Sequence, residues 1–362
     1  MLFGSLPVTS SLAGNLAFRT ATLRGMATMT ASDSSSSHPF ALKWHRSMLR
    51  AKDPVASVKY YEERYGMKLI DVYHFPTLEK SSYYLASLRD GEGDTWPVAG
   101  TAEAHKRLFN MQHACVQLDH EHGSENDPSL VYSNGNDEPH RGFGHLAFLT
   151  ADVYQASEEL EKGGVSFKKK PDEGRMKGLA FAYDPSGYWV ELVKRNNGAD
   201  FPEKFNLGQT MLRVKDADKS LAFYAGMGMT KASSFVCELH FESFSLYFLQ
   251  SLPLEEISGL PSPESPEAYS RMGQSWEPAL ELTHNHGTEN EPNFSHHNGN
   301  TDPKGFGYLG FTVDDLDGAS RWLEEQGVPE IQEPGIFKGK LRRFTDPDGY
   351  HVQLALRGAV LD

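Results

Sequence analysis

Side chains that could hold a metal ion and an anion fall on shared strand faces in the second half of this 362-residue chain. In the strand-like run QTMLR (residues 209–213), Gln209 and Arg213 point the same way, because alternate residues of a strand share a face. Glu281 and Asn285 share a face of ELTHN (residues 281–285) for the same reason. Each face therefore offers a metal ligand beside a group able to hold an anion or an amide.

Two further candidates lie in the first half. His145 begins a predicted strand after the glycine-flanked turn RGFGH, and Glu191 follows an aromatic pair in DPSGYWVE. By residue type alone, a single histidine before a strand is more often a satisfied polar residue than a ligand. A second copy of the motif, KGFGYLGF (residues 304–311), has Tyr308 in place of His145, so the two copies are predicted to differ in chemistry.

The paired motifs belong to an internal repeat. Four pairs recur at offsets of 162 to 164 residues: SMLRAKD with TMLRVKD, EHGSENDPSLVYSNGN with NHGTENEPNFSHHNGN, RGFGHLAF with KGFGYLGF, and DPSGYWVEL with DPDGYHVQL. Matches at nearly one offset indicate a duplicated domain. We expect one domain over residues 39–197 and the other over residues 204–358.

Each copy divides again into two similar stretches. In the first stretch, Asp53 and Pro54 predict a helix start, with the helix ending near residues 65–66 and strands at 68–75, 81–88 and 113–119. The second stretch predicts a strand at 145–150, a helix at 152–162 and strands at 178–183 and 188–193. The expected fold is α+β, with four βαβββ modules in two tandem domains.

Composition limits the partners. With 39% hydrophobic residues, a net charge of −14 and no run of about 18 apolar residues, the chain is expected to bind neither nucleic acid nor a membrane. Residues 1–38 contain arginines and many Ser and Thr but no acidic residue before Asp33, which is typical of a mitochondrial or plastid transit peptide. A disordered tail is the alternative. Met26 or Met29 could start a cytoplasmic form.

Several motifs together resemble the glyoxalase I family in its duplicated single-chain form. These are QTMLRVKD, LELTHN followed by GTEN, NGN before RGFGH, KKPDEGRMKGLAF and DPSGYWVE, in an order and spacing that cover residues 40–358. The resemblance implies a metal held in a cleft between paired βαβββ modules. On the matching positions, the metal ligands are Gln209, Glu281, His145 and Glu191.

The resemblance also implies a reaction and a substrate. The family acts in methylglyoxal detoxification as a lyase, isomerising the hemithioacetal of methylglyoxal and glutathione to S-lactoylglutathione through an enediolate. Glu191 would be the base and Glu281 a possible second acid/base. One divalent ion per chain is expected, zinc first, with nickel, cobalt or manganese as alternatives, and the chain is expected to be a monomer. The positions that match the family's glutathione contacts are Arg213, Asn285, Arg141, Lys169, Arg175 and Met176.

The second potential site is altered at all four ligand positions. The first module has Arg46 and Gln117, and the fourth has Tyr308 and Gln353. A cation on Arg46 would occupy the place of the metal ion, so we expect this site to be lost. The glutathione position equivalent to Asn285 is also changed, to Glu121. The altered cleft could be vestigial, structural or adapted to another ligand.

Two other functions remain open. An iron-dependent extradiol dioxygenase shares the module plan but would use two histidines and one carboxylate. A non-catalytic protein that binds glutathione conjugates is the third hypothesis. The paired loop histidines are expected to be solvated rather than ligands; they are His120 and His122, His284 and His286, and His296 and His297.

Overall fold

The computed structural model describes residues 40–196, 199, 201–239 and 242–361. The predicted transit peptide, with Met26 and Met29, lies outside these residues. Within the described part of the chain, no helix is long and apolar enough to span a bilayer.

Four βαβββ modules follow one another, as the sequence predicts. The first contains β1 (Lys43–Arg50), α1 (Pro54–Tyr65), β2 (Lys68–Phe75), β3 (Lys80–Ala86) and β4 (Cys115–Glu121). The second contains β5 (Phe143–Thr150), α3 (Val153–Lys162), β6 (Phe167–Lys169), β7 (Ala180–Tyr183) and β8 (Trp189–Lys194). The third contains β9 (Phe205–Val214), α4 (Ala217–Gly226), β10 (Thr230–Leu239), β11 (Glu242–Gln250) and β12 (Ala279–Asn285). The fourth contains β13 (Phe306–Val313), α7 (Leu316–Glu325), β14 (Glu330–Ile331), β15 (Leu341–Thr345) and β16 (His351–Leu356).

Shorter helices lie in the connections. The first and third modules each carry an insertion before their last strand: α2 (Ala102–Leu108) in one, α5 (Leu254–Ile257) and α6 (Pro266–Met272) in the other. Single 3-10 turns are found at Pro76–Leu78, Gly93–Thr95, Ser124–Asn126, Thr288–Asn290 and Gly335–Phe337.

The helix that follows the first strand of each module begins in the same way. An aspartate at the N-cap accepts a hydrogen bond from a backbone N–H of the first turn, which satisfies a donor that the helix leaves unpaired. The four caps are Asp53, Asp152, Asp216 and Asp315. The first helix ends at Gly66, whose φ of 66° is the left-handed conformation that glycine adopts without strain.

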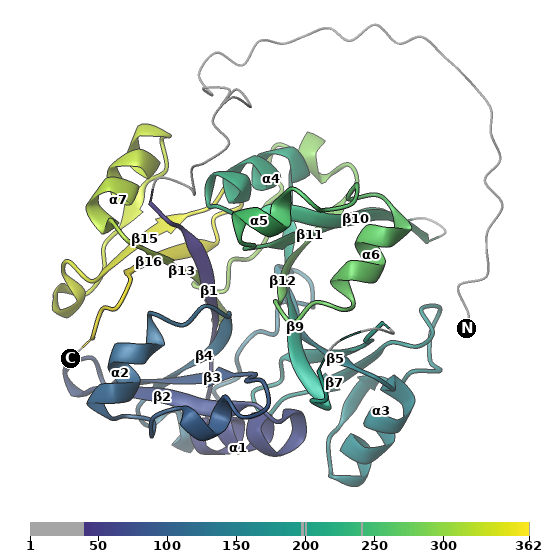
Figure 1. Cartoon of the computed structure of the whole chain (residues 1–362), viewed down its shortest axis with the longest axis horizontal. Coiled ribbons are helices and arrows are strands. Elements are labelled where there is room, and N and C mark those ends of the chain that lie inside the picture. Colours follow the sequence, from purple (N-terminus) through teal and green to yellow (C-terminus); the bar gives the residue numbers. More distant parts are fainter. Residues whose placement is uncertain (1–39, 197–198, 200, 240–241, 362) are drawn as a thin grey trace, which may run out of the picture. The chain divides into compact units, whose positions relative to one another are not determined.

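The modules pair across the repeat to make two eight-stranded sheets. The outer sheet joins the fourth module to the first in the order β14-β15-β16-β13-β1-β4-β3-β2. The inner sheet joins the third to the second in the order β10-β11-β12-β9-β5-β8-β7-β6. Antiparallel pairs β1–β13 and β5–β9 form the two seams. In Figure 1 the purple β1 lies between the yellow strands of the fourth module and the blue strands of the first.

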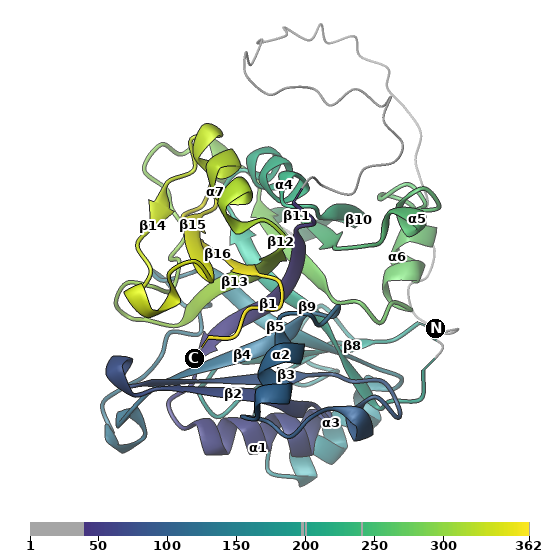
Figure 2. The same ribbon diagram turned by 60° about the vertical axis from the view of Figure 1, so that its left-hand side comes forward.

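Helices of one repeat stay together while their strands enter different sheets. Figures 1 and 2 show α1 beside α3, and α4 beside α7. Tyr61 of α1 donates a hydrogen bond to Asp184 of the second module at 3.0 Å, and Tyr224 of α4 donates to Asp346 of the fourth at 2.8 Å. One large core cluster includes buried apolar residues of all four modules. Each sheet is therefore positioned by both repeats.

Candidate metal centre

The register of the inner sheet brings the four predicted ligands together. Ala147 of β5 pairs with Gln209 of β9 on one side and with Glu191 of β8 on the other. His145 lies two residues earlier on β5, so its side chain is on the same face as that of Ala147. Glu281 lies on β12, which is the neighbour of β9. Two modules, one from each repeat, therefore supply the site.

The ligand atoms are close enough to share one ion. The Nε2 atom of His145 lies 3.1 Å from Oε2 of Glu191 and 3.6 Å from Oε2 of Glu281. One ligand atom from each of these three side chains falls within 4.8 Å of the others, and all three residues are buried. They are the only group of three or more His, Cys, Asp or Glu residues among the described ones with this spacing.

The polar atoms of this cluster fit a cation. The Oε1 atom of Gln209 is buried without a hydrogen-bond partner among the described residues, and Nε2 of His145 contacts only the carboxylates of Glu191 and Glu281. Burying such atoms is costly unless something pairs with them. One imidazole, one amide oxygen and two carboxylates differ from the closed Cys/His cage of structural zinc, and suit a divalent ion that keeps open positions.

Electrostatics within the cluster favours the same interpretation. Burial lowers the pKa of His145, but the carboxylates of Glu191 and Glu281 outweigh this effect and raise the pKa to about 9. Burial raises the pKa of Glu191, and the neighbouring His145 opposes that shift. The three side chains therefore share a proton unless a cation replaces it, so cation binding is expected to release a proton.

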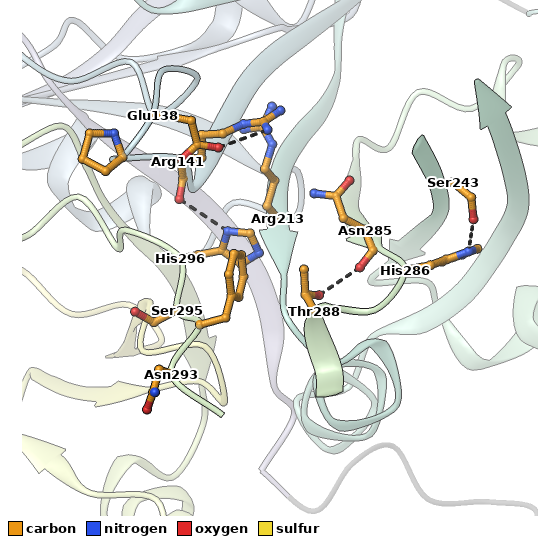
Figure 3. Close-up of a pocket in the computed structure, with 12 residues that line it drawn as sticks. Glu138, Arg141, Arg213, Ser243, Asn285, His286, Thr288, Asn293, Ser295 and His296 are labelled. Carbon is orange, nitrogen blue, oxygen red and sulfur yellow. Dashed lines mark hydrogen bonds and ion pairs between the residues drawn. The ribbon is translucent and has the colours of Figure 1, made fainter. Parts of the chain in front are cut away.

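Two adjoining cavities lead to this cluster. One, of about 250 Å³, is lined by the four predicted ligands and by an apolar wall that includes Phe181 and Phe248. The other, of about 500 Å³, is polar. Arg141, Arg213 and Asn285 line both cavities. Figure 3 shows these three side chains around the polar cavity.

Arg213 also clamps a loop. Its Nη1 atom donates to the backbone carbonyls of residues 135, 142 and 143, and Nη2 donates to Asn136 at 2.9 Å. Arg50 makes the same pattern in the outer half, with carbonyls of residues 299, 305 and 306 and with Asn300 at 2.9 Å. The same arginine-to-carbonyl hydrogen bonds are present in the outer half, where the predicted metal ligands are altered. They therefore shape the turn before β5 whether or not a metal is bound.

The remaining predicted substrate residues lie at the end of β6 and on the segment between β6 and β7. Met176 lines the smaller cavity. Lys169 donates to the carbonyl of Leu179 at 2.5 Å, and Arg175 is exposed. Neither Lys169 nor Arg175 is among the described residues that line the two cavities.

In the outer sheet a guanidinium takes the place equivalent to the ion. Arg46 is 0% exposed, and its Nε atom donates to Oε1 of Gln117 at 2.9 Å. Its Nη2 atom donates to Oε1 of Gln353 in a short hydrogen bond. Tyr308 donates to the same Gln117 oxygen at 2.9 Å. All four altered positions thus form one buried hydrogen-bonded network, which favours a structural role for the altered cleft.

The outer cleft is also filled. Phe109, which follows α2 and is 0% exposed, lies with its ring 5.1 Å from the guanidinium carbon of Arg46. The repeat-equivalent residue in the inner half is Gly273, which lines the smaller cavity. Lys304 and Glu121, the equivalents of Arg141 and Asn285, pair with each other at 3.5 Å. The sequence analysis missed the role of Phe109, although the repeat offset aligns it with a glycine.

The expectation that the loop histidines are solvated is wrong for two of them. His120 is buried at the end of β4, where its Nε2 atom lies 2.8 Å from Glu125. His296 is buried against the polar cavity. The sequence alone could not predict the burial of His296, because a polar loop becomes buried only when another segment packs on it. Here residue 297 pairs with residue 142 of the other repeat.

Comparisons with known proteins agree with this geometry. The family model described as "Glyoxalase/Bleomycin resistance protein/Dioxygenase superfamily" matches twice, at residues 43–192 and 206–354. "Glyoxalase I" of Saccharomyces cerevisiae is 36% identical over 341 residues, which cover 91% of this chain and 96% of that protein. "Lactoylglutathione lyase" of Schizosaccharomyces pombe is 36% identical over 321 residues, covering 86% of this chain and 95% of that protein.

A solved structure shows the same fold. The crystal structure of glyoxalase I from Zea mays superposes with a TM-score of 0.60 at 23% identity, covering 87% of this chain and 92% of that one. The two matches to the family model correspond to the duplication seen in the sequence. The chain belongs to the glyoxalase I family, in its duplicated single-chain form.

Proposed function

We propose that the chain is a lactoylglutathione lyase with one functional site, formed by the second and third modules. It isomerises the hemithioacetal of methylglyoxal and glutathione to S-lactoylglutathione. The observation that carries the proposal is the convergence of His145, Glu191 and Glu281 within 4.8 Å beside a cavity lined by Arg141 and Arg213. The "Glyoxalase I" and "Lactoylglutathione lyase" relatives support the same activity.

The cavities match the chemistry of a glutathione conjugate. Glutathione carries a carboxylate at each end, and a chain with net charge −14 can attract it only through a local cluster of cations. Arg141 and Arg213 offer planar guanidinium groups that suit a carboxylate, and the amide of Asn285 lies beside them. Phe181, Phe248 and their apolar neighbours would contact the carbon group attached to the reacting centre.

The reaction moves one proton between adjacent carbons. Glu191 takes the proton from C1 of the hemithioacetal and returns it to C2, while the hydroxyl proton shifts from the C1 oxygen to the C2 oxygen, so atoms balance. Glu191 is buried in the cluster, and in the metal-free chain burial raises the pKa of its carboxyl. We propose Glu281, which lies on the third module within 4.8 Å of the other two, as the second acid/base.

The metal is proposed to be held by Gln209, Glu281, His145 and Glu191. A divalent ion bound there would stabilise negative charge that develops on the substrate oxygens. Zinc is our first choice because the motifs resemble the longer, eukaryotic form of the family, whereas one imidazole and three oxygen ligands discriminate poorly and would also accept nickel, cobalt or manganese. We propose a monomer, because one chain supplies both modules of the site.

The donor set also bears on the two other functions. A dioxygenase site with two histidines has no counterpart in the described cluster, whose only imidazole is that of His145. A purely binding protein would not need two buried carboxylates beside one imidazole. Neither alternative is favoured by a specific observation.

The test measures the rate of S-lactoylglutathione formation from methylglyoxal and glutathione, with and without oxygen. We expect turnover that does not depend on oxygen, and a loss of about 100-fold or more in Glu191→Gln, whose side chain is no longer a base. Glu158→Gln, which changes an exposed glutamate of α3, is the matched control and should retain activity. Oxygen-dependent turnover, or a Glu191→Gln variant as active as the control, would contradict the proposal.

A further inference from the structure

Helix α6 of the third module forms part of the wall of the smaller cavity. Tyr269 and Met272 lie three positions apart on this helix, hence on one face, and both line the cavity. The repeat aligns α6 residue by residue with α2 of the outer half. Phe109 follows α2 and fills the outer cleft, whereas Gly273 follows α6, so the cavity beside α6 stays open.

The two helices are capped at the same carbonyl group by different parts of the chain. The last carbonyls of a helix have no partner within it. In the outer half, Nδ2 of Asn110, which lies two residues beyond α2, donates to the carbonyl of Lys106 at 2.8 Å. In the inner half the equivalent carbonyl is that of Ser270, and Nδ2 of Asn196 donates to it at 3.1 Å. Asn196 belongs to the segment that joins the two repeats, so the end of α6 depends on a distant part of the sequence.

Gly273 makes room for this contact. A Cβ atom at residue 273 would lie 2.3 Å from Nδ2 of Asn196, which is closer than two such atoms can approach. The backbone N–H of Asn196 donates to the carbonyl of Gly273 at 2.9 Å, and Nδ2 also donates to the carbonyl of Tyr269 at 3.5 Å. Hydrogen bonds from both the backbone and the side chain of Asn196 therefore hold the C-terminal end of α6.

The residue before Asn196 fixes the joining segment to the inner sheet. Arg195 is buried, and its Nη1 atom donates to the carbonyl of Glu203 at 2.8 Å. Its Nη2 atom donates to Oδ1 of Asn206 on β9 at 3.0 Å and to the carbonyl of Leu149 on β5 at 3.3 Å. Since β5 and β9 form the seam of the inner sheet, Asn196 holds α6 at a fixed position relative to the strands that carry the ligand cluster.

We propose that Asn196 is a positioning residue that sets the preference of the site for a large apolar group on the sulfur of glutathione. Its cap on α6 holds Tyr269 and Met272 against that group in the smaller cavity. A helix as short as α6 is marginal by itself, so without the cap the ligand would have to order the end of the helix when it binds.

The effect should be confined to the apolar part of the ligand. No residue of α6 is among the described residues that line the polar cavity, so the contacts made there do not depend on the cap. This inference rests on the proposed function, because the ligand concerned is the same glutathione conjugate.

The experiment measures binding by calorimetry to the metal-loaded full chain. The two probes are S-hexylglutathione and S-methylglutathione, which differ only in the apolar group. We compare wild type with Asn196→Ala, which removes the side-chain cap of α6, and with Gly273→Ala, which perturbs the same contact from the other side. Asn110→Ala is the matched control, because it removes the cap of the equivalent carbonyl at the end of α2.

We expect wild type to bind the hexyl probe about 10- to 100-fold more tightly than the methyl probe, because the longer chain buries more apolar surface. Asn196→Ala should reduce this ratio about 5- to 10-fold through weaker binding of the hexyl probe, as for the loss of one or two hydrogen bonds. Gly273→Ala should reproduce the reduction, and combining it with Asn196→Ala should add little. Asn110→Ala should keep the wild-type ratio.

Three results would overturn the inference: equal binding of both probes by wild type, an equal loss for both probes in Asn196→Ala, or the same change of ratio in Asn110→Ala as in Asn196→Ala. The proposed function would survive each of them as long as the hemithioacetal is turned over. If wild type neither binds a probe nor turns over the hemithioacetal, the proposed function fails and the inference with it. Because Gly273→Ala disturbs the same contact, the test does not depend on the folding of one variant.

Discussion

Replacing Arg46 by methionine tests whether a guanidinium has taken over the structural place of a metal in the outer sheet. Methionine can fill much of the apolar space between the rings of Phe109 and Tyr308, which lie 5.1 and 5.6 Å from the guanidinium carbon. It cannot donate a hydrogen bond. The Oε1 atom of Gln353 would then lose its donor, whereas that of Gln117 would keep Tyr308.

Two opposing effects determine how much Arg46→Met lowers the free energy of unfolding. Removing a buried charge saves its desolvation, and replacing a whole buried ionic network by apolar groups is often neutral. Here the two glutamine amides stay behind, so the cost is set by one unsatisfied buried oxygen, about 1–3 kcal/mol, and by lost hydrogen bonds from a charged group. We expect Arg46→Met to lower the free energy of unfolding by about 3 kcal/mol and Tm by roughly 5 °C.

The assay pairs thermal unfolding with turnover per folded chain. Since the proposed metal ligands all lie in the inner sheet, turnover and metal content at 25 °C should remain those of wild type. Arg46→Lys, which keeps the charge but not the planar set of donors, should be intermediate in stability. An Arg46→Met protein as stable as wild type, or one that loses metal in proportion to turnover, would refute this reasoning.

Two further substitutions probe packing and titration. A Cβ atom at Gly310 would lie 2.6 Å from Cγ of Arg46, so Gly310→Ala should lower the free energy of unfolding by about 1–3 kcal/mol. Denaturant titration should show a smaller decrease when the same substitution is made in Arg46→Met. Burial and the neighbouring Asp348 raise the pKa of Asp346 to about 7 from its usual 3.8, so the folded chain binds this proton more tightly than the unfolded chain. Its contribution to stability is therefore full below about pH 4 and falls as the pH rises to about 7, by at most about 1.4 kcal/mol per pH unit. Denaturant titrations from pH 4 to 7 should show that Asp346→Asn has a flatter stability profile than wild type; parallel profiles would contradict the shift.

The sequence predicted most of the scaffold because its local rules agree with the fold. Asp53 and Pro54 placed a helix that the structure starts at Pro54, and the strand predicted at 68–75 is β2. The alternation of strand faces grouped Gln209 with Arg213, and both line the smaller cavity. Such features depend on neighbours in the sequence, which is why they could be predicted.

Contacts between distant segments were harder to predict. Phe109, which fills the outer cleft, follows the inserted helix α2, where the sequence shows no strand pattern. The burial of His296 depends on a loop from the other repeat. The backbone clamp made by Arg213 uses carbonyl groups, which every residue type carries alike. These features arise where two repeats meet, and only the repeat offset could have hinted at them.

Metal content per chain tests the central claim most directly. Wild type should be measured by elemental analysis after exhaustive dialysis, beside His145→Ala, which removes the only imidazole of the described cluster. One equivalent of divalent metal in wild type and far less in the variant is the result we predict. Two equivalents in wild type, or one retained by His145→Ala, would contradict a single centre built by the second and third modules.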